Sequence, residues 1–214
     1  MIFRSLITLL LCSGVVFAQQ DDLPFPGFPK LETKSTGEWW KITNRGLNVP
    51  RDQVVAFALY THDRGVLKLT AQLYPLMPDE SRDVRLEFFE GDQWKEVARQ
   101  KVIELGWSAH FRIEPWDNSK DVKYRIRHGE RAEFEGLIRK DPIDKDEIVI
   151  GNLSCNSSRT PGPRPKMIEN LKRQDPDILF FAGDQSYHHT EHTFGFIEWG
   201  IQFRDVIRDR PVIT

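Results

Sequence analysis

The stretch PDILFFAGDQSYHH, residues 176–189, is a short apolar run that ends in potential metal ligands. Residues 178–182 are apolar or small, as in a buried strand of a parallel sheet. Gly183 then permits a sharp turn of the backbone. The side chains beyond it are able to bind a metal or exchange a proton: Asp184, Tyr187, His188 and His189. We therefore predict a functional loop at the end of a buried strand.

The segments around this stretch alternate between apolar strands and helices. An apolar stretch, EIVIGNLSCN at 147–156, precedes a short predicted helix at 164–173. A second helix is predicted over 193–208, and PVIT at 211–214 begins a third strand. This alternation indicates a parallel sheet that is covered on both faces.

The loops that follow the first two strands should meet at one point. Ligands of open parallel sheets bind beyond the carboxyl ends of the strands, and consecutive strands of this kind are usually neighbours. The first loop contains Asn152, Cys155 and Asn156. A carboxylate and a phenol favour iron, manganese or calcium, whereas a thiolate also suits iron or zinc. We therefore predict a metal site that includes Cys155 and Asp184, with Tyr187 able to join it.

Ordinary structural roles remain as alternatives for these residues. Asp184 is also suited to capping a turn, and an isolated cysteine such as Cys155 is commonly a small buried hydrophobe. Tyr187 can pack with its hydroxyl group in water. A solvated loop is the favoured interpretation for the histidines, although Cys155, His188 and His192 would also suit a zinc site.

Residues 37–142 show a different pattern, in which apolar and polar side chains alternate. In VLKLTAQLY, residues 66–74, every second position from Leu67 to Leu73 is apolar, as in a half-buried strand. Six further stretches are predicted as strands: VVAFALY (54–60), VRLEFFE (84–90), WKEVARQKV (94–102), WSAHFRI (107–113), VKYRIRH (122–128) and RAEFEGLIR (131–139). Turn-forming residues separate them, so the pattern predicts an antiparallel β-sandwich of immunoglobulin or fibronectin type.

The first residues predict that the chain is exported. Residues 1–18 have a basic start, an apolar stretch and a small-residue cleavage site, which are the features of a secretory signal peptide. The Pro- and Gly-rich residues 19–36 are typical of a linker or an extended arm. Beyond the signal peptide no stretch approaches about 20 apolar residues, so we expect a periplasmic or extracellular protein without a membrane span.

Charge and cysteine content limit the partners of the mature chain. Cleavage of residues 1–18 removes Arg4 and no acidic residue, so the net charge changes from −2 to about −3, which gives no case for a nucleic-acid-binding surface. Cleavage also removes Cys12, which leaves Cys155 without an intramolecular disulfide partner. An unpaired cysteine in an exported chain is a candidate reactive thiol or metal ligand.

The C-terminal third of the chain resembles the PhoD-like alkaline phosphatases, a branch of the calcineurin-like metallophosphoesterases. The resemblance rests on Ser154-Cys155 after the first strand, on Pro176-Asp177, and on GDQSY at 183–187. It implies that a β-sandwich precedes an α/β/β/α sandwich. It also implies that Cys155 and Tyr187 bind iron, that Asp184 bridges iron to calcium, and that phosphate monoesters and diesters are hydrolysed. Zinc and manganese are the alternative metals.

The same resemblance implies ligands that this sequence does not contain. The family has a D-D-H-D-like loop and a late D-x-H motif, and neither is present. We therefore expect residues 147–214 to be the opening of a larger, truncated metallophosphoesterase domain that is inactive alone. Asn156, His188 and His189 are expected near the substrate or the metal. The alternative is an exported β-sandwich binding module that carries a degenerate phosphatase remnant.

Overall fold

The computed structural model describes the chain from residue 49 to residue 214 with short gaps. The described residues are 49–77, 79–104, 106–156, 164–187 and 192–214. The predicted signal peptide (1–18) and linker (19–36) lie outside them. Among the described residues, no helix is long and apolar enough to cross a membrane.

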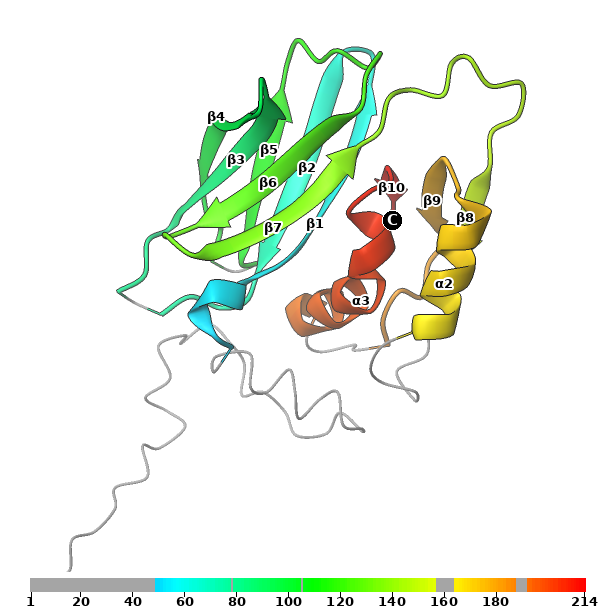
Figure 1. Ribbon diagram of the computed structural model, residues 1–214. Helices are drawn as coiled ribbons and strands as arrows, with labels where there is room; N and C mark the ends of the chain where they lie inside the picture. Colours follow the sequence, from blue (N-terminus) through cyan, green and yellow to red (C-terminus); the bar gives the residue numbers. More distant parts are fainter. Residues whose placement is uncertain (1–48, 78, 105, 157–163, 188–191) are drawn as a thin grey trace, which may run out of the picture.

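Two antiparallel sheets form a β-sandwich (Figure 1). One sheet has the order β1-β2-β5, and the other has the order β4-β3-β6-β7. The bounds of the strands are β1 Val55–Asp63, β2 Val66–Leu73, β3 Asp83–Glu90, β4 Gln93–Lys101, β5 Ser108–Ile113, β6 Val122–His128 and β7 Ala132–Ile138. Each of the seven predicted strands is therefore confirmed.

The alternation of apolar and polar residues explains why the sandwich closes. In β2, Leu67, Leu69 and Leu73 are buried while Lys68 is exposed, because successive side chains of a strand point to opposite faces. Removing each leucine from water stabilises the fold by roughly 1.5–3 kcal/mol. Buried side chains of the other strands, except β4, join these leucines in one shared core between the sheets.

The C-terminal part is a small parallel sheet with two helices. Its elements are β8 Ile150–Leu153, α2 Pro165–Gln174, β9 Ile178–Phe181, α3 His192–Ile207 and β10 Val212–Ile213. The strands lie in the order β10-β9-β8, and β9 pairs in parallel with both neighbours. The predicted helices and strands of this part are confirmed within a few residues.

The prediction that both faces of this sheet are covered is wrong for the described residues. Each new strand, from β8 to β9 to β10, is placed at the same edge of the growing sheet. Because both crossover connections are right-handed, α2 and α3 lie on the same face of the sheet. The two helices contact each other there. Leu179 and Phe181 of β9 are buried on that face. On the opposite face Ile150 is 59% exposed, Phe180 40% and Ile213 46%.

Helix α3 docks the parallel sheet onto the sandwich. Phe57 of β1 packs edge-on against Phe196 and Trp199 of α3, with ring centroids 5.5 and 6.2 Å apart. The Arg204 guanidinium lies over the Phe134 ring of β7 at 5.1 Å. The aromatic residues of both parts belong to one hydrophobic core. The sandwich therefore fixes the position of the helix that supports the parallel sheet.

Asp175 adds a polar link between the two parts. It caps the C-terminus of α2 with a left-handed backbone, φ 46°, and its Oδ1 accepts hydrogen bonds of 2.7 Å from both Arg139 and Arg210. Arg139 follows β7 of the sandwich, whereas Arg210 precedes β10. The Arg139 hydrogen bond outweighs the opposing effect of desolvation and, with Arg210, holds the pKa of Asp175 below its usual value.

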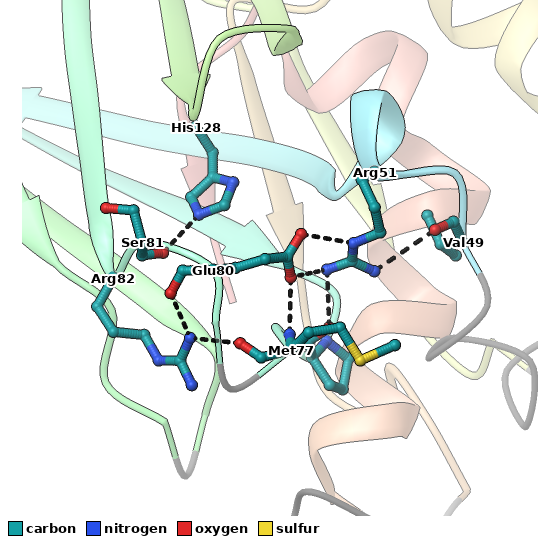
Figure 2. Close-up of polar contacts among 8 residues, drawn as sticks. Val49, Arg51, Met77, Glu80, Ser81, Arg82 and His128 are labelled. Atoms are coloured by element: carbon teal, nitrogen blue, oxygen red, sulfur yellow. Dashed lines mark hydrogen bonds and ion pairs between the residues drawn. The ribbon is translucent and has the colours of Figure 1, made fainter.

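A second polar cluster holds the connection between β2 and β3 (Figure 2). Arg51, in the 3₁₀ helix η3 (Arg51–Gln53), donates hydrogen bonds from Nε and Nη2 to the Glu80 carboxylate, the first of 2.6 Å. The backbone N–H of Met77 donates to the same carboxylate at 2.7 Å. His128 Nε2 donates to the carbonyl of Ser81 at 2.7 Å. These bonds tie the connection to two separate elements of the sandwich.

Replacing Glu80 with glutamine should destabilise the chain in a pH-dependent way. Burial raises the pKa of Glu80, but the hydrogen bonds from Arg51 and Met77 outweigh it and leave the pKa below its ordinary value of 4.5. The carboxylate therefore stabilises the fold above pH 4.5, and this stabilisation is lost as the pH falls through the lower folded pKa. We expect Glu80→Gln to lower the free energy of unfolding at pH 7 by about 1.5–3 kcal/mol, as for a hydrogen bond to a charged group.

Urea unfolding of the variant and the unmodified chain at pH 7 and near pH 3 measures this difference. The control is Glu90→Gln, because Glu90 forms an exposed pair with Lys95 at 3.4 Å and should contribute less than about 1 kcal/mol. Equal losses in the two variants, or a Glu80→Gln effect that does not shrink at low pH, would contradict the assignment.

Candidate metal centre

The loops after β8 and β9 meet at one edge of the parallel sheet. The last residues of the two strands, Leu153 and Phe181, are register partners. Backbone hydrogen bonds continue the contact beyond the strands, from Ala182 N to Leu153 O at 2.7 Å and from Asn156 N to Asp184 O at 2.8 Å. The structure thus brings together the two loops that sequence reasoning expected to converge.

Both loops contain left-handed backbone at the residues of interest. Cys155 has φ 55° and Asp184 has φ 54°, while Gly183 between the strand and Asp184 has φ 98°. A left-handed conformation costs a residue with a side chain about 1–2 kcal/mol, and such positions are often found at functional sites. Two of them in contacting loops favour a functional role over simple chain reversal.

Asp184 is the centre of a cluster of three side chains of types that are able to bind a metal. Its Oδ2 accepts a hydrogen bond from the Tyr187 hydroxyl group at 3.0 Å and lies 3.5 Å from Cys155 Sγ. Ser154 Oγ lies 3.4 Å from the same sulfur. Cys155, Asp184 and Tyr187 are all solvent-exposed. A thiol, a carboxylate and a phenol are therefore within hydrogen-bonding distance of one another at an accessible position.

The electrostatic environment of this cluster favours a cation. The hydrogen bond to the Asp184 carboxylate, followed by desolvation and the neighbouring Cys155, raises the pKa of Tyr187 to about 12. The phenol therefore remains protonated near neutral pH, because its loss of a proton would add a negative charge beside others. A bound cation would oppose this effect and favour the phenolate form.

A cleft of about 450 Å³ opens beside the cluster. Its polar wall includes Cys155, Asp184 and Arg164, and its apolar wall includes Phe181 and Phe203. Phe203 of α3 packs edge-on against Phe181 with ring centroids 5.1 Å apart. The cleft thus lies between the ends of the strands and the helices that cover them.

Asn156 lines the cleft and also holds its parts together. Its side-chain amide group donates to the carbonyl of Gln185 at 3.1 Å and to Gln202 Oε1 at 2.6 Å. Its Oδ1 accepts hydrogen bonds from Nε and Nη2 of Arg164, at 3.3 and 3.1 Å. Asn156, predicted near the substrate or the metal, therefore links the first loop to α3 and to the start of α2.

Sequence reasoning did not identify Arg164 or Gln202. Gln202 is 4% exposed and lies between Ile201 and Phe203 in α3. A polar residue within an apolar part of a helix was the feature of the sequence that could have indicated its role. Arg164 immediately precedes α2 and was assigned only to that helix. The contact between Asn156 and Gln202 joins residues 46 positions apart.

The structure does not test the interpretation of the loop histidines, either as solvated residues or as zinc ligands. His188 and His189 lie outside the described residues, and so does the side chain of His192, which leaves the zinc alternative untested. Within the described part of the chain, no group of three histidine, cysteine, aspartate or glutamate residues is arranged to hold a metal. The cluster described above contains one cysteine and one aspartate, and its third member is a tyrosine.

Comparison with known proteins supports a relationship at the level of the fold. No family model matches the chain, and no curated protein matches it. The solved structure of PhoD is similar over 76% of this chain, with a TM-score of 0.55 and 13% sequence identity. At this identity the likeness shows a shared fold alone. The chain covers 38% of the length of that PhoD structure.

Two carbohydrate-active enzymes are also similar over part of the chain. One is a Paenibacillus cycloisomaltooligosaccharide glucanotransferase with 16% sequence identity and a TM-score of 0.35, and the match covers 63% of this chain and 21% of that enzyme. The other is a β-glucuronidase from an uncultured Clostridium with 12% sequence identity and a TM-score of 0.27, and the match covers 73% of this chain and 28% of that enzyme. These TM-scores are too low to support an argument about this chain.

Proposed function

We propose that this chain contributes to the metal centre of an exported phosphoesterase that hydrolyses phosphate monoesters or diesters. The observation that carries the proposal is the cluster of Cys155, Asp184 and Tyr187 at the carboxyl ends of two adjacent parallel strands. Ligands of open parallel sheets bind at this position. The fold-level likeness to PhoD supports the same proposal.

The donor set fits the metals that the family resemblance implies. Cys155 and Tyr187 would hold iron, and Asp184 would bridge iron to calcium. Carboxylate and phenolate oxygens suit these cations, and a thiolate is compatible with iron. The Asp184 carboxylate and the neighbouring Cys155 raise the pKa of Tyr187, so a cation at this position would be attracted by the same groups. Zinc and manganese remain alternatives for the same side chains.

The residues of the chain have separate tasks in this proposal. Bound cations would neutralise phosphate oxygens and lower the pKa of the attacking nucleophile. Asp184 holds the hydroxyl group of Tyr187 and contacts Cys155, so it orients both side chains. Phe181 and Phe203 give the cleft an apolar wall on the side of the helices. Export rests on the predicted signal peptide at residues 1–18.

Binding of ferric iron to the purified chain tests this proposal. A tyrosinate bound to ferric iron absorbs visible light, so we expect a coloured complex whose band is lost in Tyr187→Phe. Tyr74→Phe is the matched control, because Tyr74 follows β2 in the sandwich. The iron complex of this variant should keep the visible absorption band. The proposal fails if the unmodified chain forms no such band or if Tyr187→Phe retains it.

A further inference from the structure

The cleft beside the candidate metal centre is lined in part by apolar side chains from four different elements. These are Leu153 at the end of β8, Met167 of α2, Phe181 at the end of β9 and Phe203 of α3. The cysteine and the aspartate of the cluster line the same cleft. A phosphate ester that reaches the cluster would therefore meet apolar surface within the same site.

The two phenylalanines form the bottom of the cleft. Phe181 is 3% exposed and Phe203 is 1% exposed, and both rings belong to the hydrophobic core. Leu153 is partly buried and packs against that core. Because core side chains are closely packed, this part of the lining has a fixed shape.

Met167 is the most exposed of the four apolar side chains. Helix α2 buries Ile168 and Leu171, whereas Met167 is 42% exposed. Consecutive residues of a helix lie about 100° apart, so Met167 lies to the side of the buried stripe. Methionine is unbranched and flexible, and it adapts its shape to apolar groups of different form. An exposed methionine that lines a cleft is therefore suited to contact a ligand.

The cleft has more room than a phosphate group requires. Its volume of about 450 Å³ is within the range of roughly 300–1,000 Å³ that is usual for sites that bind whole small molecules. The phosphoryl group would lie at the cluster, where a cation can neutralise its oxygens. The remaining volume is then available to the alcohol part of the ester, and the apolar lining favours an alcohol that is itself apolar.

We propose that the apolar lining of the cleft binds the alcohol part of the phosphate ester. The site then prefers esters of apolar alcohols, such as aryl phosphates, to esters of polar alcohols, such as glycerol phosphate. An apolar group gains free energy when it leaves water, whereas a polar alcohol loses hydrogen bonds to water that this lining does not replace. Met167 is the specificity-determining residue. This inference rests on the proposed phosphoesterase function and specifies the substrate class of the same site.

The test measures the affinity of the iron-loaded chain for phenylphosphonate and for hydroxyethylphosphonate by calorimetry near pH 8. Both probes have a phosphoryl group and a P–C bond in place of the ester bond, so they report binding alone. Iron loading is first established from the visible absorbance. We expect phenylphosphonate to bind roughly 10-fold or more tightly, in the range that hydrophobic pockets achieve when they discriminate between ligands.

Variants of Met167 test whether this residue carries the preference. Met167→Gln keeps the length and the helix propensity of the side chain but makes its end polar. It should weaken phenylphosphonate binding roughly 3- to 10-fold and change the affinity for the other probe by less than about 2-fold. Met167→Leu keeps the apolar character and should retain most of the preference.

A matched control makes the same kind of change outside the cleft. Ile143 is 86% exposed and does not line the cleft, so Ile143→Gln should change neither affinity. Because Met167 is also exposed, urea unfolding of Met167→Gln should coincide with that of the unmodified chain. A selective loss of phenylphosphonate affinity at unchanged stability then reports a lost contact rather than a lost structure.

The outcomes distinguish this inference from the proposed function. Iron binding together with equal affinity for the two probes, or with a preference that Met167→Gln does not reduce, overturns the inference and leaves the proposed function standing. A Met167-dependent preference in a chain that takes up no iron supports the apolar site and overturns the metal centre. A chain that binds neither probe, with or without iron, overturns the inference.

Discussion

Replacing Gly200 with alanine should lower the free energy of unfolding by about 3 kcal/mol, the upper part of the range for overpacked cores. A Cβ atom at this position of α3 would lie 2.0 Å from Cε1 and 2.1 Å from Cζ of Phe57. Phe57 is fully buried and packs against Phe196 and Trp199, so its ring has no free space into which to move. The strain must also exceed the roughly 1 kcal/mol by which alanine improves a helix over glycine.

The effect should extend to the candidate site, because α3 supports the end of β9. Trp199 and Phe203 of α3 pack against Phe181, with ring centroids 4.8 and 5.1 Å from it. Phe181 is the last residue of β9, three positions before Asp184. A helix displaced from β1 would therefore shift the wall of the cleft as well as the contact between the two parts of the chain.

Chemical unfolding of Gly200→Ala alone and with Phe57→Leu checks this prediction. The smaller leucine side chain removes the ring atoms that clash, so the double variant should lose less stability than the sum of the two single changes. Glu169→Ala, on the exposed side of α2, serves as the control and should stay within about 0.5 kcal/mol of the unmodified chain. A Gly200→Ala chain of unchanged stability would show that α3 and β1 are not in close contact.

Most strands of the sandwich were predictable because they bury one face, as β2, β6 and β7 do. Strand β4 is the exception, since none of its residues is buried. It is an edge strand, paired only with β3 in its sheet, so its sequence is little constrained by the core. Its backbone hydrogen bonds to β3 nevertheless define it as a strand.

Contacts between distant segments were not predictable from the sequence. The one-sided coverage of the parallel sheet depends on the order of its strands, which the apolar runs of β8 and β9 do not reveal. Gly200 could be recognised as a glycine within a helical pattern, which often has a packing reason, but its partner Phe57 lies more than a hundred residues earlier.

The closeness of the two loops was predictable from the sequence, but the contacts that support them were not. The parallel-sheet rule placed Cys155 and Asp184 together, because both follow strands at their carboxyl ends. It carried no information on backbone conformation, so the left-handed φ of both residues was not foreseen. The link from Gln202 through Asn156 to Arg164 depends on how α3 packs beside the sheet, which is a property of the tertiary structure.

Replacing Asp184 with asparagine should weaken the binding of ferric iron roughly 100-fold or more, beyond the range for residues that only support metal ligands. Asp184 contacts both other members of the cluster, so the change removes the negative charge at its centre. Titration of iron from a competing chelator, followed by the visible band, measures the affinity. The control is Asp205→Asn, an exposed aspartate of α3 that should leave the affinity unchanged.

The choice of asparagine separates the role of Asp184 as a ligand from its role in the fold. Asp184 has φ 54°, and asparagine tolerates this left-handed backbone better than most residues, so the loop should keep its shape. The stability of Asp184→Asn should accordingly remain within about 1 kcal/mol of the unmodified chain. A large loss of iron affinity at unchanged stability would then report the loss of a ligand. Iron affinity that stays within about threefold would show that the carboxylate does not bind the metal, because a ligating charge is worth far more than this.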